Sequence, residues 1–224
     1  MNGKVDRIVR SHVISKERVA EHGEVLTGQR EVSAMLDLVK QETQRIESRF
    51  LEPACGNGNF LAEVLTRKLT IVEKRYRKSQ REYERYAVLA VSSIYGIDIL
   101  EDNVRQCRSR LLGIFEAPYR RLFQSRIDDG CFATVCFILE RNILWGNALT
   151  METTGDPPEP LVFSEWSPVN GSQIKRRDFT FRSLLRESGF GNSPLFDQAP
   201  TDSFIPTPER AYPLAHFLKL SNVS

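Results

Sequence analysis

Apolar and polar positions alternate along the chain in patterns that predict helices and strands in turn. In residues 31–39, Val32, Met35, Leu36 and Val39 recur at the i, i+3, i+4, i+7 spacing of an amphipathic helix. Short apolar runs that each end in a polar residue predict three buried strands, at residues 50–52, 93–99 and 142–149. This order of elements is typical of an α/β domain with a mainly parallel sheet.

The segments between these strands predict more helix than a minimal fold needs. Residues 131–139 fit either a strand or a buried helix. The charges of residues 71–91 alternate in sign, which favours a solvated helix face with ion pairs over a nucleic-acid-binding face. The other elements that we expect are helices at residues 71–91, 102–112, 118–126 and 179–185, a fourth strand at residues 161–163, and a last apolar segment at residues 211–220.

Residues 51–60, with the sequence LEPACGNGNF, place two glycines between a strand and a helix. Gly56 and Gly58 allow a tight backbone turn after Glu52 that leads into a helix near Asn59. A phosphate-binding loop would continue with Lys and Ser or Thr, and a dinucleotide fingerprint would carry a third glycine, so neither motif fits. The stretch predicts either a ligand-binding loop or an ordinary glycine turn.

Polar residues at the ends of the next two predicted strands favour the binding loop. Asp98 ends the run SIYGID, and Asn147 follows the run NILWG. Ligands bind at the carboxyl ends of the strands in open parallel sheets, so Glu52, Asp98 and Asn147 are expected to lie together there. A carboxylate at the second strand end can accept hydrogen bonds from both hydroxyls of a ribose. The pattern therefore favours a ligand that carries a ribose at this edge.

The motif E-P-A-C-G-x-G-x-F resembles the cofactor loop of amino-methylating DNA methyltransferases from restriction-modification systems, which use S-adenosylmethionine. Residues 22–27, HGEVLT, resemble the family's G-x-F/V-x-T-P segment, with Gly28 in place of Pro. The resemblance implies a three-layer, Rossmann-like methyltransferase fold and methylation of DNA adenine. It places methionine on the loop, ribose on Asp98 and adenine on Ile99 and Asn147. The implied cofactor-binding residues are Thr27, Glu52, Pro53, Ala54, Cys55, Gly56, Asn57, Gly58, Asp98, Ile99, Asn147 and Ala148.

The same family positions the target amine with an [NDS]-P-P-[YFW] tetrapeptide after its fourth strand. The closest match is SPVN at residues 167–170, which keeps Ser167 and Pro168 but lacks the second Pro and the aromatic residue. Trp166 is the candidate for stacking on a flipped base, although a Trp at a strand end also fits a core position. Residues 156–158, DPP, come too early and are expected to form a turn. The resemblance thus implies Ser167, Pro168 and Trp166 as catalytic residues.

The cations Lys175, Arg176 and Arg177 follow this tetrapeptide and are expected to contact DNA phosphates. The 54 residues after Asn170 are too few for the remaining strands and a target-recognition domain. We therefore expect a methyltransferase of a restriction-modification or phage-defence system that is either a small divergent member or active with a partner subunit that supplies recognition. Two other functions stay open, namely a cofactor-binding subunit or sensor without catalysis, and a methyltransferase that acts on RNA, protein or a small molecule. The expected organisation is an N-terminal arm with a closing helix, a cofactor-binding core, and a polar arm with a last apolar segment, at residues 1–48, 49–188 and 189–224.

The composition indicates the general class of protein and its compartment more than its function. The formal net charge is +2 and the pI about 8.4, which is less basic than a dedicated DNA-binding domain. Hydrophobic residues make up 41% and charged residues 27%, as in globular domains, and no apolar run is long enough for a membrane span. Residues 1–10 also lack the apolar core of a signal peptide, so we expect a cytoplasmic protein. The four cysteines lack metal-site spacing and the three histidines are scattered, so we expect free thiols and no metal site.

Overall fold

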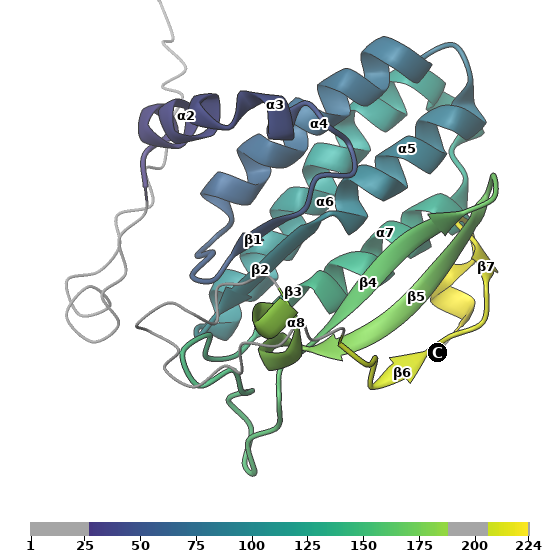
Figure 1. Ribbon diagram of the computed structural model, residues 1–224. Coiled ribbons are helices and arrows are strands. Elements are labelled where there is room, and N and C mark those ends of the chain that lie inside the picture. The colour runs from purple at the N-terminus through teal and green to yellow at the C-terminus, as the bar shows by residue number, and fades with distance from the viewer. Residues whose placement is uncertain (1–26, 188–205, 224) are drawn as a thin grey trace, which may run out of the picture.

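The computed structural model describes residues 27–187 and 206–223, which form a mixed α/β domain (Figure 1). The helices are α2 (Gln29–Leu38), α3 (Lys40–Thr43), α4 (Asn59–Tyr76), α5 (Gln80–Ser92), α6 (Glu101–Phe123), α7 (Asp129–Asn142) and α8 (Phe181–Glu187), with short 3-10 helices η1 (Gln124–Arg126) and η3 (Leu220–Asn222). The strands are β1 (Phe50–Glu52), β2 (Ile94–Asp98), β3 (Ile143–Trp145), β4 (Val162–Val169), β5 (Gln173–Thr180), β6 (Arg210–Ala211) and β7 (Ala215–His216).

Strands β1, β2 and β3 form a parallel sheet with β2 in the centre. Phe50 at the start of β1 pairs with Ile94, and Asp98 at the end of β2 pairs with Trp145. The predicted α/β class with a parallel sheet is therefore confirmed, although the strands are shorter than the apolar runs suggested. Because the strands run in one direction, the residues that follow them emerge at a common edge of the sheet.

The fourth strand differs from its prediction in both length and direction. β4 spans eight residues instead of the predicted three, and it pairs antiparallel with the eight residues of β5. Asn170, Gly171 and Ser172 connect the two strands, and the first two have positive φ angles of 33° and 69°. An Asn-Gly pair is a strong hairpin signal, because both residues tolerate the positive φ angles that tight turns between antiparallel strands use. The expected helix at residues 179–185 starts later, at Phe181, because β5 extends through Thr180.

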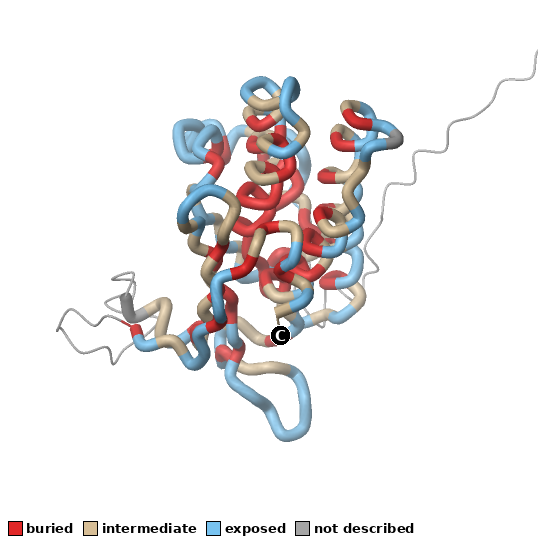
Figure 2. Tube along the Cα trace, turned by 90° about the vertical axis from the view of Figure 1, so that its right-hand side faces the viewer, coloured by how far each residue is buried: buried red, intermediate tan, exposed pale blue. Residues whose placement is uncertain are grey.

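The parallel sheet separates two hydrophobic clusters. Ile94 and Ile143 face the buried sides of helices α4 to α7, which cover one face of the sheet. Tyr95 and Ile97 point to the other face, where they pack against Phe163 and neighbouring residues of the hairpin and α8. The hairpin covers this second face near Phe163, and farther along it packs directly against α5 and α7, where Trp166 and Ile174 join the helix cluster. Figure 2 shows the buried positions gathered in the interior of the domain.

The predicted single helix over residues 71–91 is wrong, because the chain breaks between α4 and α5. α4 ends at Tyr76, and Ser79 caps the start of α5 by accepting a weak hydrogen bond from the Glu82 amide at 3.5 Å. Ser79 and Glu82 have the spacing of a capping box, which marks a new helix start. The sequence therefore contained the signal for two helices.

At residues 102–126 the sequence predicts two helices, but one continuous helix, α6, covers most of this range. α6 continues through Pro118 up to Phe123. Its buried residues include Cys107, Leu111, Phe115, Tyr119 and Phe123, which recur every fourth position along one side. Burial of this uninterrupted apolar stripe explains why the helix persists despite the backbone hydrogen bond that proline removes. The ambiguous segment at residues 131–139 belongs to a helix, α7, which Asp128 caps.

The C-terminal segment is part of the domain core. β6 and β7 pair with β5, and Phe217 and Leu220 belong to the same buried cluster as helices α4 to α7. The expected apolar segment at residues 211–220 therefore packs against the domain through its buried residues. The predicted N-terminal arm before Thr27 and the polar arm at residues 189–205 lie outside the described residues.

A fully buried lysine anchors the chain just before β1. The Lys68 ammonium on α4 donates hydrogen bonds to the backbone carbonyls of Ile46 and Ser48 and to the Ser93 hydroxyl. It also lies 5.1 Å from the centre of the Phe50 ring. Burial lowers the pKa of Lys68 to about 7. Lys68 therefore joins α4 to the two segments that lead into β1 and β2.

This burial predicts a rise in stability between pH 7 and 8. Over that range the folded chain loses the Lys68 proton, while the unfolded chain, with a lysine pKa near 10.4, keeps it. The free energy of unfolding is expected to increase by about 1 kcal/mol, because stability rises with pH wherever the unfolded state binds more protons. Urea unfolding at both pH values measures the slope, and Lys68→Met should remove it. An equal slope in Lys68→Met would contradict the assignment.

Candidate functional site

A cavity of about 610 Å³ opens at the carboxyl ends of β1, β2 and β3. Its wall is formed by the loop after β1, the turn after β2, the turn after β3 and parts of α2 and α4. Of the twelve cofactor-binding residues predicted from sequence, all but Asn57 and Gly58 line this cavity. They are Thr27, Glu52, Pro53, Ala54, Cys55, Gly56, Asp98, Ile99, Asn147 and Ala148.

The glycine loop is held against the end of β2 by its own backbone. The Cys55 amide donates to the Ile97 carbonyl at 2.9 Å, and the Gly58 amide donates to the Cys55 carbonyl at 2.8 Å. Gly56 and Gly58 have φ angles of 52° and 85°, a region that favours glycine. Gly58 then provides the first position before α4. The loop is thus a fixed turn that presents backbone atoms to the cavity.

The Cys55 thiol lies beneath this loop and is buried. A hydrogen bond with Cys107 and burial raise the pKa of Cys55 far above its usual range. Both cysteines are free, and the neutral thiol is a poor nucleophile. Cys55 therefore contributes packing to the loop, with no nucleophilic role.

Asp98 connects the loop to the turn that follows β2. One carboxylate oxygen accepts from the Gly56 amide at 2.8 Å, and the other accepts from the Leu100 amide at 2.9 Å and the Asn103 side chain at 3.2 Å. A carboxylate offers about four acceptor positions, so these donors leave room for roughly one more. Asp98 thus fixes the shape of the cavity and can accept one hydroxyl group, where the sequence led us to expect two.

Glu52 and Asn57 offer two acceptor groups in this segment, and the first of them accepts a hydrogen bond from the Ala54 backbone. Burial raises the pKa of the half-buried Glu52 carboxyl group at the end of β1. The Asn57 side-chain oxygen is buried and has no hydrogen-bond partner among the described residues. A buried acceptor without a donor is costly. Only Glu52 of these two lines the cavity and can accept from a ligand there.

Asn147 is oriented by the turn after β3. Its side-chain oxygen accepts from the Leu149 amide at 2.8 Å, and the Thr150 amide lies 3.4 Å away. The backbone N–H groups of Leu149 and Thr150 need an acceptor. The side-chain oxygen of Asn147, and not its NH2 group, is therefore assigned to the turn. The oxygen that the sequence offered for the adenine amine is therefore engaged in the turn, and the NH2 group is the end that remains for a ligand.

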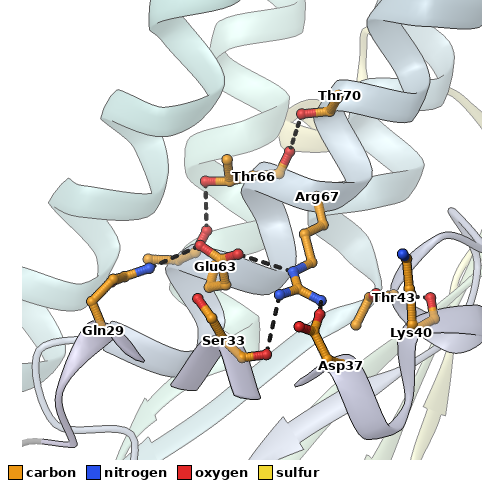
Figure 3. A network of polar contacts seen from close by, with 10 residues as sticks. Gln29, Ser33, Asp37, Lys40, Thr43, Glu63, Thr66, Arg67 and Thr70 are labelled. Carbon is orange, nitrogen blue, oxygen red and sulfur yellow. Dashed lines mark hydrogen bonds and ion pairs between the residues drawn. The ribbon is translucent and has the colours of Figure 1, made fainter. Parts of the chain in front are cut away.

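Helix α2 forms one side of the cavity and is tied to α4. The Glu63 carboxylate accepts from Gln29 and Arg67, and Arg67 also binds Asp37 and the Ser33 carbonyl (Figure 3). At the start of α4, the Asn59 side chain donates to the Thr27 carbonyl at 3.1 Å. These contacts explain why the segment after residue 26 reaches the cavity.

Several cavity residues were missed at the sequence level. Phe60 ends the E-P-A-C-G-x-G-x-F motif, and Met35 lies in the predicted helix at residues 31–39, so both had signals. Leu100 and Asn103 follow Asp98, but only the structure shows that the chain turns back toward the cavity there. The lining residues outside the predicted set are Met35, Asn59, Phe60, Leu100, Asn103, Gly146 and Leu149.

The predicted catalytic residues lie away from this cavity. Trp166 is buried, and its ring nitrogen donates at 2.9 Å to Asn142, the residue just before β3. Glu165 pairs at 2.5 Å with Arg49, the residue just before β1. Both partners precede strands, so this part of β4 lies at the amino ends of the parallel sheet. Ser167 and Pro168 follow within β4, and the expectation that they end a strand beside the cavity is wrong.

The predicted DNA-contacting residues belong to β5 and are largely engaged. Arg176 is buried and paired with Asp178 at 2.7 Å, below the ring of Tyr212 at 3.9 Å. Arg177 pairs with Glu165 at 2.5 Å. Lys175, which precedes them in the sequence, is half-exposed. The three residues therefore form no free basic cluster, because neighbours on a strand point to opposite faces.

Comparisons of the chain with protein-family models, with curated proteins and with solved structures found no match. None of the helices in the described ranges combines the length and apolar character that a membrane span requires. The described part of the chain also holds no group of three or more His, Cys, Asp or Glu side chains suited to a metal ion. The function must therefore be argued from the geometry of the cavity.

Proposed function

We propose that the chain binds S-adenosylmethionine in this cavity and provides the cofactor-binding part of a DNA adenine methyltransferase. The observation that carries the proposal is the meeting of three separate sequence segments, ending in Glu52, Asp98 and Asn147, around one cavity. A Rossmann-like arrangement of the parallel sheet belongs to the same proposal. The cavity lies at the carboxyl ends of the strands, where open parallel sheets bind nucleotides.

The cavity suits the three parts of this cofactor. Its volume of about 610 Å³ lies within the range of small-molecule sites. Glu52 would receive the amino-acid ammonium group, and Asp98 would receive a ribose hydroxyl. Ile99, Ala148 and Leu149 supply apolar surface for the adenine ring. When bound, the cofactor supplies an electrophilic methyl group on a sulfonium centre.

We expect residues outside β4 to position the adenine that accepts the methyl group. An amino-methylating site needs a polar acceptor next to the target amine and an aromatic surface for the flipped base. Among the residues that line the cavity, none repeats the [NDS]-P-P-[YFW] pattern. The chain would therefore need a partner subunit to position the base, so we expect the isolated protein to transfer little or no methyl group.

The position of Trp166 and Ser167 favours a second candidate. The hairpin buries Trp166 and carries the degenerate tetrapeptide toward the amino ends of the sheet. A protein that keeps the cofactor cavity without an acceptor site would act as a cofactor-binding subunit or sensor. Both candidates require cofactor binding and differ only in methyl transfer.

Calorimetric titration tests the shared step, and a tritiated-methyl transfer assay separates the two candidates. We expect the purified chain to bind S-adenosylmethionine and S-adenosylhomocysteine with one site per chain. No binding at millimolar cofactor would reject the proposal as a whole. Transfer to mixed-sequence DNA that appears only with the products of neighbouring genes would support the methyltransferase, and binding without transfer in every combination would support the sensor.

A further inference from the structure

The break between α4 and α5 gathers cations at one corner of the domain. Seven exposed basic residues define this basic corner. They are Lys74, Arg75, Arg77, Lys78 and Arg81 around the helix break, Arg126 in η1, and Lys219 near the C-terminus. The sequence suggested that the charges near residue 75 alternate along one solvated helix, but the break turns them toward a single corner.

Three hydrogen bonds bring the separate segments together. Gln80 donates its side-chain amide to the Arg126 carbonyl. Arg81 donates to the Ser172 hydroxyl at 3.1 Å, and the Ser172 carbonyl accepts from the Phe217 amide at 2.9 Å. The C-terminal segment therefore lies beside the start of α5. Burial and the charges of Arg81 and Lys219 lower the pKa of His216, which agrees with cations meeting at this place.

The basic corner has little compensating negative charge. Within the described residues, none of the seven cations forms an ion pair with a carboxylate. The neighbouring acids have other partners, since Glu73 pairs with Arg121, Glu82 with Arg85, and Asp128 caps α7. The Asp128 carboxylate opposes the effect of the cations on His216, and Asp129 is exposed in the first turn of α7. These two acids offset at most two of the seven charges. The corner thus carries a concentrated positive field.

We propose that the basic corner binds the phosphate backbone of a nucleic acid. A regular row of phosphates needs only exposed cations, which supply affinity without reading sequence. Four of the seven cations are arginines, whose planar groups bind phosphate through two parallel hydrogen bonds. This surface does not depend on the cofactor cavity, because it lies at the opposite end of α4, about 25 Å away by helix length (Figure 1).

Other polyanionic partners fit this surface less well. A protein partner needs an apolar interface core, and peripheral membrane binding is strengthened by apolar side chains that insert. The large exposed apolar residues of the described chain all lie outside the basic corner, at Met35, Leu38, Val39, Leu51, Ile99, Trp145, Leu149, Val162 and Leu214. The corner is therefore suited to a partner recognised by charge alone.

A matched pair of triple variants tests the proposal. The first carries Arg75→Gln, Arg77→Gln and Lys78→Gln in the basic corner. The control carries Lys40→Gln, Arg45→Gln and Arg105→Gln, which remove the same residue types from exposed positions elsewhere. Both variants change the net charge equally, and thermal unfolding checks that both fold. Fluorescence anisotropy with a short labelled DNA duplex is measured over a range of salt concentrations, without cofactor.

We expect wild type and control to bind DNA with similar salt dependence. The corner variant should bind at least about tenfold more weakly at low salt, and its salt slope should shrink by about 1 for each phosphate that it no longer neutralises. Equally weakened binding in both variants, or no DNA binding by the wild type, would overturn the proposal. Binding to vesicles of anionic lipid in the absence of DNA binding would overturn it in favour of a membrane surface. None of these outcomes depends on cofactor binding in the cavity.

Discussion

Gly58→Val is expected to abolish cofactor binding and to destabilise the domain. A side chain at this position would place its Cβ atom 2.7 Å from the Cys107 sulfur and 3.5 Å from the Cys107 Cα, in a backbone conformation with φ of 85°. The left-handed conformation costs about 1–2 kcal/mol for a residue with a side chain, and overpacking adds about 1–3 kcal/mol. Relief of this strain would move the loop that lines the cavity.

Urea unfolding and calorimetric titration with S-adenosylhomocysteine measure the two effects of Gly58→Val. Gly113→Ala is the matched control, because a Cβ atom there meets nothing within 4 Å and the residue lies inside α6. Alanine in a helix interior is expected to stabilise the domain by about 0.5–1 kcal/mol without changing affinity. A Gly58→Val protein with wild-type stability and affinity would show that this turn is unimportant for the site.

The cavity was largely predictable because strand direction determines where polar residues meet. Once three successive apolar runs form a parallel sheet, the residues after each run share one edge, and Glu52, Asp98 and Asn147 meet there. The hydrogen bonds inside the site were not predictable in the same way. The Leu149 amide engages the Asn147 oxygen, and this depends on the exact turn after β3.

The fourth strand shows why an apolar run alone does not give direction. A short apolar segment at residues 161–163 fits a parallel strand and an antiparallel strand equally well. The direction follows from Asn170 and Gly171, whose turn folds β5 back onto β4. The hairpin also determines where the basic residues of β5 point, because alternate residues of a strand face the core. Arg176 is consequently buried beside Asp178.

Two predictions of helix boundaries were wrong, for different physical reasons. The α4–α5 break depends on a local cap at Ser79, which a search for apolar periodicity does not detect. The continuity of α6 through Pro118 depends on long-range burial, which overrides the local preference of proline. The first feature was present in the local sequence, whereas the second required knowledge of the packed helices.

Asp98→Asn is expected to weaken cofactor binding almost as much as Asp98→Ala. The two carboxylate oxygens accept from different donors, Gly56 on one side and Leu100 with Asn103 on the other. An asparagine has a single oxygen, so its NH2 group would face one of these donors. Loss of one charge-assisted hydrogen bond costs about 1.5–3 kcal/mol, which corresponds to a Kd increase of roughly tenfold or more.

Titration with S-adenosylhomocysteine measures this loss, and amide hydrogen exchange identifies its origin. If Asp98 acts by holding the loop, both variants should speed exchange at the amides of Gly56 or Leu100 even without ligand, because these amides lose a buried acceptor. Asp156→Asn makes the same charge change at an exposed position and should leave both readouts unchanged. Wild-type affinity in Asp98→Asn would mean that one oxygen suffices. Weaker binding with unchanged exchange would assign Asp98 to direct contact with the ribose, whereas faster exchange would show that the carboxylate first builds the cavity that the ribose enters.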